Sequence, residues 1–79
     1  MTTIEKIEYI GSKKMLRMER WRNPLGAWRV GIEWYSEDRV EFMCEHDSLD
    51  TCLNKMILWI DTPAKERKGN KFRKQLDAI

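Results

Sequence analysis

Three residues of types that bind metal ions lie close together in the middle of the chain. Cys44, His46 and Cys52 follow the pattern C-x-H-x5-C, with Asp47 and Asp50 between them. Zinc usually takes about four ligands in tetrahedral geometry, and its sites commonly include a Cys-x-x-Cys pair, which this chain lacks. Both cysteines fall on apolar positions of their segments, where a free thiol packs as a small hydrophobic group. We expect two core thiols and no metal, with a zinc site and a disulfide as the alternatives.

Carboxylates are the second group that could do chemistry. Glu33, Glu41 and Glu45 are expected on one sheet face, and paired carboxylates can act as acid and base when burial raises one pKa. Arg17 and Arg29 are expected beside them on that open face, which favours solvated surface charges. The sequence has one histidine, no glycine-rich phosphate loop, and no Ser or Cys with a base at motif spacing. We predict that the protein is not an enzyme and takes no cofactor.

The elements that position these residues follow from the spacing of apolar side chains. Apolar residues alternate with polar ones over 27–35 and again over 39–46, and this period of two is typical of strands. Residues 15–21 form a further predicted strand, with Leu16 and Met18 facing inward. The turn Asn23-Pro24-Leu25-Gly26 and the polar loop 36–38 join the three strands into an antiparallel sheet.

Residues 3–10 fit two structures. Ile7 and Tyr9 alternate with charged residues, which favours a strand that turns at Gly11. The alternative is a helix in which Thr2 and Glu5 form a capping box and Gly11 ends the helix. We predict the strand, which would make four strands in all.

The period changes to helical at Leu49, with Asp47 predicted as the N-cap. Seven apolar side chains cover one arc of this helix, from Leu49 to Ile60, whereas Leu58 points away from the arc. The arc matches the apolar face of the sheet, so the helix must lie on that face. The predicted core cluster is Trp28, Ile32, Trp34, Phe42, Leu53 and Met56.

The predicted fold class is therefore α+β: an antiparallel sheet of three to four strands with one main helix packed on one face and a basic C-terminal segment. Residues 1–61 form a single domain, and 62–79 form a basic tail with room for a short helix. No apolar run approaches the ~20 residues of a membrane span, and the N-terminus lacks the pattern of a secretory signal. We expect a cytoplasmic protein that does not bind membranes.

Charge is divided unevenly along the chain. Residues 1–61 hold nine Lys or Arg against eleven Asp or Glu, a balance of −2, and residues 62–79 hold six against two, a balance of +4. The two balances give the net charge of +2. A basic segment can bind phosphates, and an acidic face can meet a basic partner.

Two resemblances of layout concern nucleic acids. Three antiparallel strands with a tryptophan in the middle strand and a helix across them, over Lys14–Ile60, resemble the integrase-type DNA-binding domains. That resemblance implies an exposed sheet face in the major groove, but here the face would carry four glutamates against two arginines, which repels phosphates. If residues 3–10 were helical, the order would resemble a double-stranded RNA-binding domain. The lysine cluster of those domains is replaced here by Asp47 and Asp50.

The surface that remains after the core is assigned favours a protein partner. Aromatic residues and Met are enriched at protein interfaces, and carboxylates would suit a partner with a basic surface. The predicted partner-binding residues are Glu19, Glu33, Glu41, Glu45, Trp21, Tyr35, Met43 and Leu58.

We therefore expect a non-catalytic protein-binding module. In size and style it resembles the accessory proteins of phages and mobile elements that inhibit a host protein, including anti-CRISPR-type inhibitors. The alternative is a nucleic-acid-binding accessory factor that uses the basic tail. Its predicted contact residues are Lys65, Arg67, Lys68, Lys71, Arg73 and Lys74.

Overall fold

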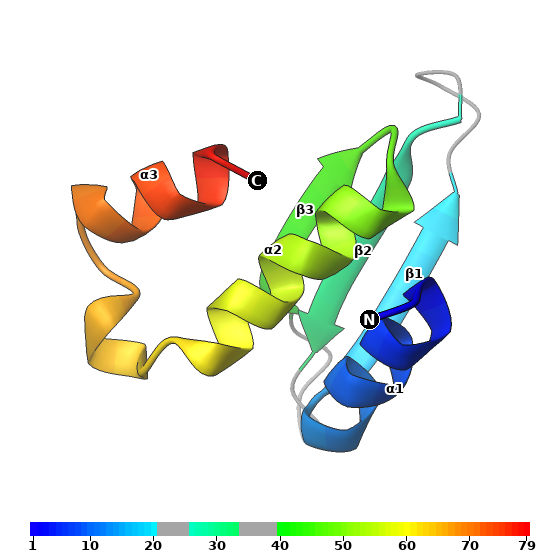
Figure 1. The fold of residues 1–79 in the computed structure, drawn as a ribbon, viewed down its shortest axis with the longest axis horizontal. Helices are drawn as coiled ribbons and strands as arrows, with labels where there is room; N and C mark the ends of the chain where they lie inside the picture. The colour runs from blue at the N-terminus through cyan, green and yellow to red at the C-terminus, as the bar shows by residue number, and fades with distance from the viewer. Residues whose placement is uncertain (21–25, 34–39) are drawn as a thin grey trace.

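A computed structural model describes residues 1–20, 26–33 and 40–79 (Figure 1). The elements in chain order are α1 (Thr3–Lys13), β1 (Met15–Arg20), β2 (Trp28–Glu33), β3 (Val40–His46), α2 (Leu49–Asp61), the short 3-10 helix η1 (Ala64–Glu66) and α3 (Asn70–Asp77). The predictions made above for Trp21, Leu25, Trp34 and Tyr35 lie outside the described residues.

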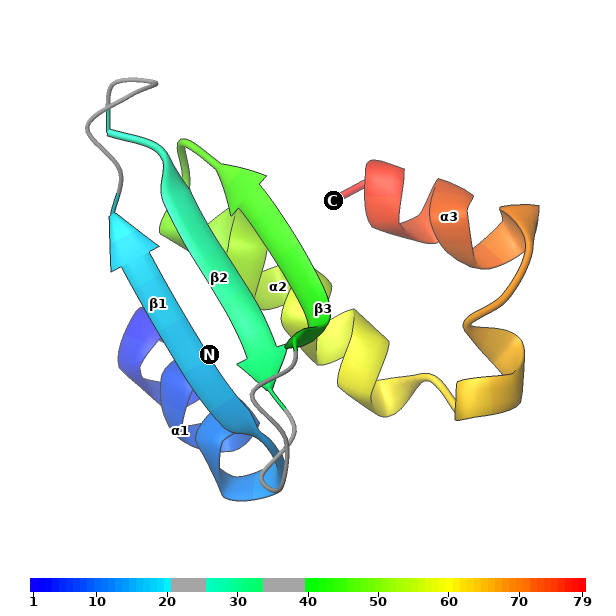
Figure 2. The same ribbon diagram turned by 180° about the vertical axis from the view of Figure 1, so that it is seen from behind.

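The three strands form one antiparallel sheet in the order β1-β2-β3. Ile32 of the central strand lies opposite Leu16 on one side and Phe42 on the other. Helices α1 and α2 cover one face of this sheet, and the view from behind shows the other face without a helix (Figure 2). The predicted α+β fold with a main helix on the sheet is confirmed, with three strands in the sheet.

One hydrophobic core lies between the sheet and the helices. Val30 and Ile32 of the sheet and Leu53 and Met56 of α2 are fully buried, together with Ile10 of α1. Trp28 and Phe42 pack against this cluster from partly buried positions. The predicted core is thus confirmed for its described members, while Ile10 was missing from it because residues 3–10 were assigned to the sheet.

The strand predicted for residues 3–10 is wrong, because this segment is helix α1. Thr2 and Glu5 form the capping box: the Thr2 amide donates to Glu5 Oε1 at 2.9 Å, and the Glu5 amide donates to Thr2 Oγ1 at 3.2 Å. Ile7 and Ile10, three residues apart, face the core on one side of the helix. Gly11 does not end the helix, which continues to Lys13.

Side-chain hydrogen bonds join α1 to α2 at both ends. Thr3 Oγ1 donates to Asp50 Oδ1 at 2.8 Å near the two N-termini, and the Tyr9 hydroxyl donates to Asp61 near the two C-termini. The helices therefore run in the same direction. The Asp61 carboxylate accepts this hydrogen bond and raises the pKa of Tyr9.

The predicted N-cap of the second helix is off by one residue. Ser48, not Asp47, caps α2, and its Oγ accepts a hydrogen bond from the Thr51 amide at 3.2 Å. The backbone amide of Ser48 also donates a hydrogen bond to His46 Nδ1 at the end of β3, at 2.9 Å. No described helix is long and apolar enough to cross a membrane.

Substitution of Leu53 tests the assignment of the hydrophobic core. Replacement by Ala leaves a cavity between α2 and the sheet, and such changes cost about 2–5 kcal/mol. The reserve of a small domain is only about 5–15 kcal/mol, so Leu53→Ala should lower the denaturation midpoint strongly in urea titrations. Met43→Ala, at a position 41% exposed, is the control and should shift it little. Equal shifts would contradict the assigned core.

The titration of Asp50 tests the contact between α1 and α2. The hydroxyl of Thr3 and the ammonium of Lys6, 3.4 Å away, lower the pKa of Asp50 below its ordinary value of 3.8. The ionised form is favoured in the folded state. Its stabilising effect is therefore complete above the unfolded pKa and is lost as pH falls through the folded pKa. The protection of α1 amides, measured as the intrinsic exchange rate at each pH divided by the observed rate, should therefore fall below about pH 4.

Asp50→Asn is the control for this acid effect. It removes the titration while preserving an oxygen that can accept from Thr3, so the protection of α1 amides should depend less on pH. Some dependence should remain, because hydrogen bonds from Thr2 also lower the pKa of Glu5. Identical pH profiles in the two proteins would rule out the assigned role of Asp50.

Candidate functional site

The sheet face opposite the helices is the first candidate site. Among the described residues no element covers it (Figure 2), and we call it the open face. Three residues from each strand lie on it: Met15, Arg17 and Glu19 of β1, Arg29, Gly31 and Glu33 of β2, and Val40, Met43 and Glu45 of β3. It contains four of the predicted partner-binding residues, namely Glu19, Glu33, Met43 and Glu45.

A register shift in the sheet changes which side chains reach this face. Between Ile32 and Glu33 the pairing slips, so that Glu33 lies opposite Val40. A Cβ atom at Gly31 would lie 3.5 Å from Val40 Cγ1, which places Val40 on the open face. Strict alternation along β3 puts Val40 on the core face, and the bulge reverses that assignment.

The same shift removes Glu41 from the predicted acidic face. The Glu41 carboxylate lies 3.5 Å from Lys14 Nζ, and Lys14 Nζ is 5.8 Å from the ring centroid of Trp59 in α2. Glu41 therefore lies on the helix side of the sheet. Its predicted place beside Glu33 and Glu45 is wrong, because the alternation of the sequence does not reveal a bulge.

The carboxylates of the open face form ion pairs with its two arginines. Arg17 lies between two of them, with nitrogen–oxygen distances of 2.9 Å to Glu19 and 3.0 Å to Glu33. Glu33 and Glu19 together raise the pKa of Arg17. Arg29 Nε donates to Glu45 at 2.8 Å. With three carboxylates against two guanidiniums, this face carries a balance of only −1, so its field is weaker than an unpaired acidic face would give.

Apolar side chains occupy the gaps between these ion pairs. Met15, Val40 and Met43 are 38%, 40% and 41% exposed. A hollow of about 250 Å³ opens beside them. Its lining consists of Arg17, Glu19, Arg29, Gly31, Glu33, Val40 and Met43.

Gly31 lies in the middle of the central strand and lines this hollow. A Cβ atom there would make only ordinary contacts, at 3.5 Å to Val40 and 3.6 Å to the Phe42 carbonyl oxygen. The fold therefore does not require glycine at this position, although glycine weakens a strand. Gly31 was not among the predicted site residues. A glycine inside a strongly alternating strand was the feature of the sequence that could have indicated it.

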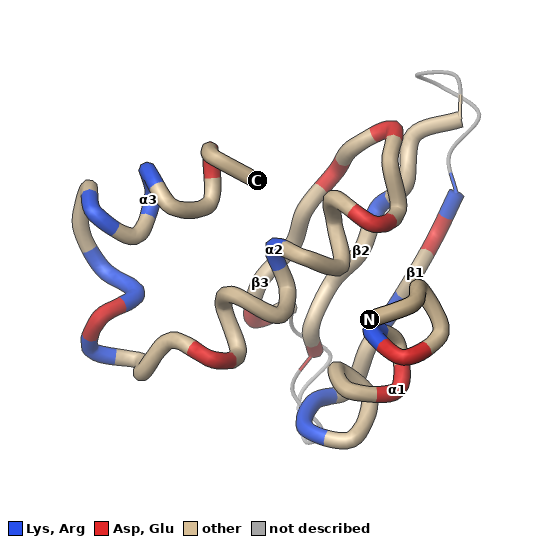
Figure 3. The backbone as a smooth tube through the Cα atoms, viewed as in Figure 1, with Lys and Arg blue, Asp and Glu red and all other residues tan. Residues whose placement is uncertain are grey.

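The second candidate site is residues 62–79, which we call the basic arm. Figure 3 shows Lys and Arg gathered along η1 and α3. Arg67 Nε donates to the carbonyl oxygens of Trp59 at 2.7 Å and Thr62 at 2.9 Å, and its guanidinium carbon lies 3.6 Å from the centroid of the Trp59 ring. Arg67 therefore joins the arm to the end of α2. The other five predicted nucleic-acid contacts are exposed: Lys65, Lys68, Lys71, Arg73 and Lys74.

Phe72 anchors the arm, and residues of the arm lie beside Leu58 of α2. Phe72 is 5% exposed and belongs to the same core cluster as Ile32. Leu58 packs against this cluster and lines a hollow together with Phe72 and Pro63. The buried arc predicted for α2 was derived from packing against the sheet alone, and it left Leu58 outside. The arm lies against it instead.

The thiols and the histidine do not form a described ligand cluster. Cys52 is fully buried as predicted, and its Sγ lies 3.7 Å from the Cys44 carbonyl oxygen, to which it donates. Burial raises the pKa of Cys52 to about 12, so this thiol stays protonated at neutral pH. Cys44 is partly buried, and both cysteines are free. Within the described ranges, no group of three or more His, Cys, Asp or Glu residues is arranged to hold a metal ion.

Comparison with protein-family models, with curated proteins and with solved structures finds no match to this chain. The order α1-β1-β2-β3-α2 does follow the layout that the sequence analysis associated with double-stranded RNA-binding domains. The start of α2 departs from those domains, since the Asp50 carboxylate there is engaged by Thr3 and Lys6. The open face and the basic arm therefore have to be interpreted from their own chemistry.

Arg67→Lys tests how the arm is held. A lysine keeps the charge but lacks the planar guanidinium that both stacks on Trp59 and donates to two carbonyl groups. Hydrogen exchange of amides in α3 should become at least about tenfold faster, the change expected from losing about 1.4 kcal/mol. Exchange at Ile32 and Leu53 should change little. Unchanged protection of α3 would show that Phe72 alone holds the arm.

Proposed function

We propose that the protein is a cytoplasmic, non-catalytic protein-binding module that receives its partner on the open face. The observation that carries this proposal is the composition of that face: exposed Met15, Val40 and Met43 beside a hollow at Gly31, within a frame of ion pairs. Protein interfaces commonly have such an apolar centre and a polar rim.

The ion pairs support this proposal because they hold the rim in place before binding. Arg17 pairs with Glu19 on its own strand and with Glu33 on β2, and Arg29 of β2 pairs with Glu45 of β3. A surface whose long side chains are already ordered loses less side-chain entropy when a partner binds. Gly31 and Val40 line the hollow, and the long side chains around them include the ion-paired Arg17 and Arg29.

The charge of the face refines the expected partner. Because the balance is only −1, long-range attraction to a basic surface is modest. Glu45 has the most exposed side chain among the carboxylates of the face, at 55%, whereas that of Glu33 is 14% exposed. We therefore propose a partner with an apolar protrusion for the hollow and a basic group that meets Glu45 at the rim.

The biological role follows from this mode of binding. A small module without a catalytic step acts on its partner by occluding a surface. We propose inhibition of a host protein, in the manner of the phage and mobile-element accessory proteins that this chain resembles in size. The fold alone implies no such role, so the role depends on the identity of the partner captured by the open face.

Gly31→Val provides the test. The Cβ atom of the new side chain meets only ordinary contacts, and the variant should preserve or raise the melting temperature, since Val favours strands and Gly does not. It also fills part of the hollow. We expect at least a tenfold loss of affinity for the partner, measured by calorimetry with a partner first isolated from nuclease-treated host lysate.

Gly11→Val is the matched control. Gly11 is exposed on α1, and a Cβ atom there would meet nothing within 4 Å. This variant makes the same chemical change away from the open face and should bind the partner as the wild type does. Wild-type affinity in a folded Gly31→Val variant would remove the open face as the binding surface.

A further inference from the structure

The basic arm presents cations on a folded support. Lys65, Lys68, Lys71 and Lys74 recur at every third position and are exposed, as is Arg73. Among the described residues, none of these five side chains has a carboxylate within ion-pairing distance. The arm holds only two acidic residues, Glu66 and Asp77. Its positive charge is therefore available to a ligand.

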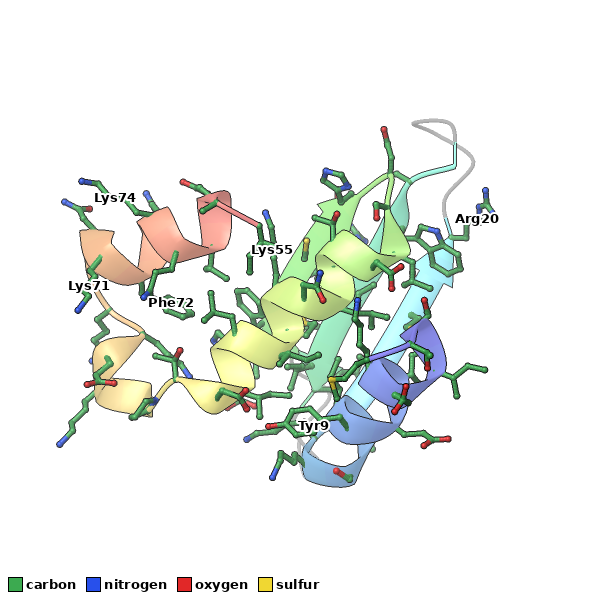
Figure 4. The ribbon with its side chains drawn as sticks, viewed as in Figure 1. Tyr9, Arg20, Lys55, Lys71, Phe72 and Lys74 are labelled. Carbon is green, nitrogen blue, oxygen red and sulfur yellow. The ribbon has the colours of Figure 1, made fainter. Side chains whose placement is uncertain are left out.

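The lysines of α3 are exposed, whereas its anchor Phe72 is buried. Lys71 and Lys74 are three residues apart, which places them on the same side of a helix. Figure 4 shows both pointing away from the rest of the molecule, whereas Phe72 points toward α2. The buried phenyl ring thus fixes which side of α3 faces solvent.

The support of the arm fixes these charges relative to the domain. Arg67 binds the end of α2 through Trp59 and Thr62. Gly69 has a φ of 94°, in the left-handed region that favours glycine, and it turns the chain from η1 into α3. A cationic surface held in this way loses less conformational entropy on binding than a disordered lysine tail does.

From this arrangement we propose that the basic arm binds the phosphate backbone of double-stranded nucleic acid without reading its sequence. Lysines that neutralise phosphates release condensed counterions, and this release drives binding to a duplex. Phe72 is the one aromatic residue in 62–79, and it is 5% exposed. The arm consequently lacks the aromatic platform on which proteins stack the bases of single strands.

An anionic membrane is the competing ligand for a basic helix. Helices that bind the membrane interface insert a free apolar face between the lipids. The apolar side of α3 is already occupied, because Phe72 is buried in the core and Leu76 packs against it. Charge alone would have to hold α3 on a bilayer, which favours the duplex as the ligand.

This binding activity goes beyond the proposed protein-binding function and uses a different part of the molecule. The arm extends from the end of α2, whereas the open face is the side of the sheet that the helices leave uncovered (Figures 1 and 2). A partner on the open face therefore leaves the outward lysines of α3 accessible.

The test is a double variant, Lys71→Gln with Lys74→Gln. Fluorescence anisotropy with a labelled mixed-sequence duplex would measure affinity across a salt series from about 50 mM to about 200 mM. For the wild type, four or five phosphate contacts predict a slope of log affinity against log salt of about −4. The double variant should reduce that slope by about 2 and weaken binding at least tenfold at the lowest salt, with an unchanged circular dichroism spectrum.

Lys13→Gln with Arg20→Gln removes the same number of charges from α1 and β1 and is the matched control. It should retain the wild-type slope, as should Gly31→Val, which separates this proposal from the one for the open face. Equal salt slopes for the two double variants would overturn the proposal. So would tighter binding of the wild type to anionic vesicles, or to a single strand of equal length, than to the duplex.

Discussion

The ring of Trp59 is the contact on which the arrangement of the other elements depends. It stacks on Phe42 of the sheet, with centroids 5.5 Å apart and planes within 9° of parallel. The guanidinium of Arg67 lies 3.6 Å from its centroid, and Lys14 lies 5.8 Å away. One indole thus joins the sheet, the main helix and the basic arm. Aromatic stacking and cation–π contacts each contribute roughly 0.5–2 kcal/mol, a sizeable share of a small domain's stability.

The bulge beside Ile32 separates two chemical environments that strict alternation would have mixed. It sends Glu41 to the helix side, where its carboxylate pairs with Lys14 near Trp59. It also brings Val40 to the open face beside Gly31. One extra residue in an edge strand therefore gives the open face an apolar centre and lowers its negative charge. This is why we propose a partner chosen by shape more than by charge.

Much of the fold could be predicted from the sequence, because the patterns in β2, β3 and α2 are strong and agree with one another. The spacing of Trp28 with Ile32 and of Leu53 with Met56 was enough to predict the core. Residues 3–10 were harder, since alternation and helical spacing coexist there. The capping box of Thr2 and Glu5 was the better signal, because it satisfies helix-end amides that a strand would not expose. Other features depend on contacts between distant segments, which no local pattern contains. These are the bulge, the contacts of Arg67 with the end of α2, and the position of the basic arm beside Leu58.

Gly31 connects the stability of the domain with its proposed use. A domain of 79 residues has little stability in reserve, and a glycine at the centre of its central strand reduces that reserve. A Cβ atom would meet only ordinary contacts there, so a close approach of neighbouring atoms does not account for the glycine. The structural consequence of glycine is the hollow on the open face, which a β-branched side chain would partly fill. If the open face binds a partner as proposed, glycine there exchanges stability of the domain for space at the binding surface.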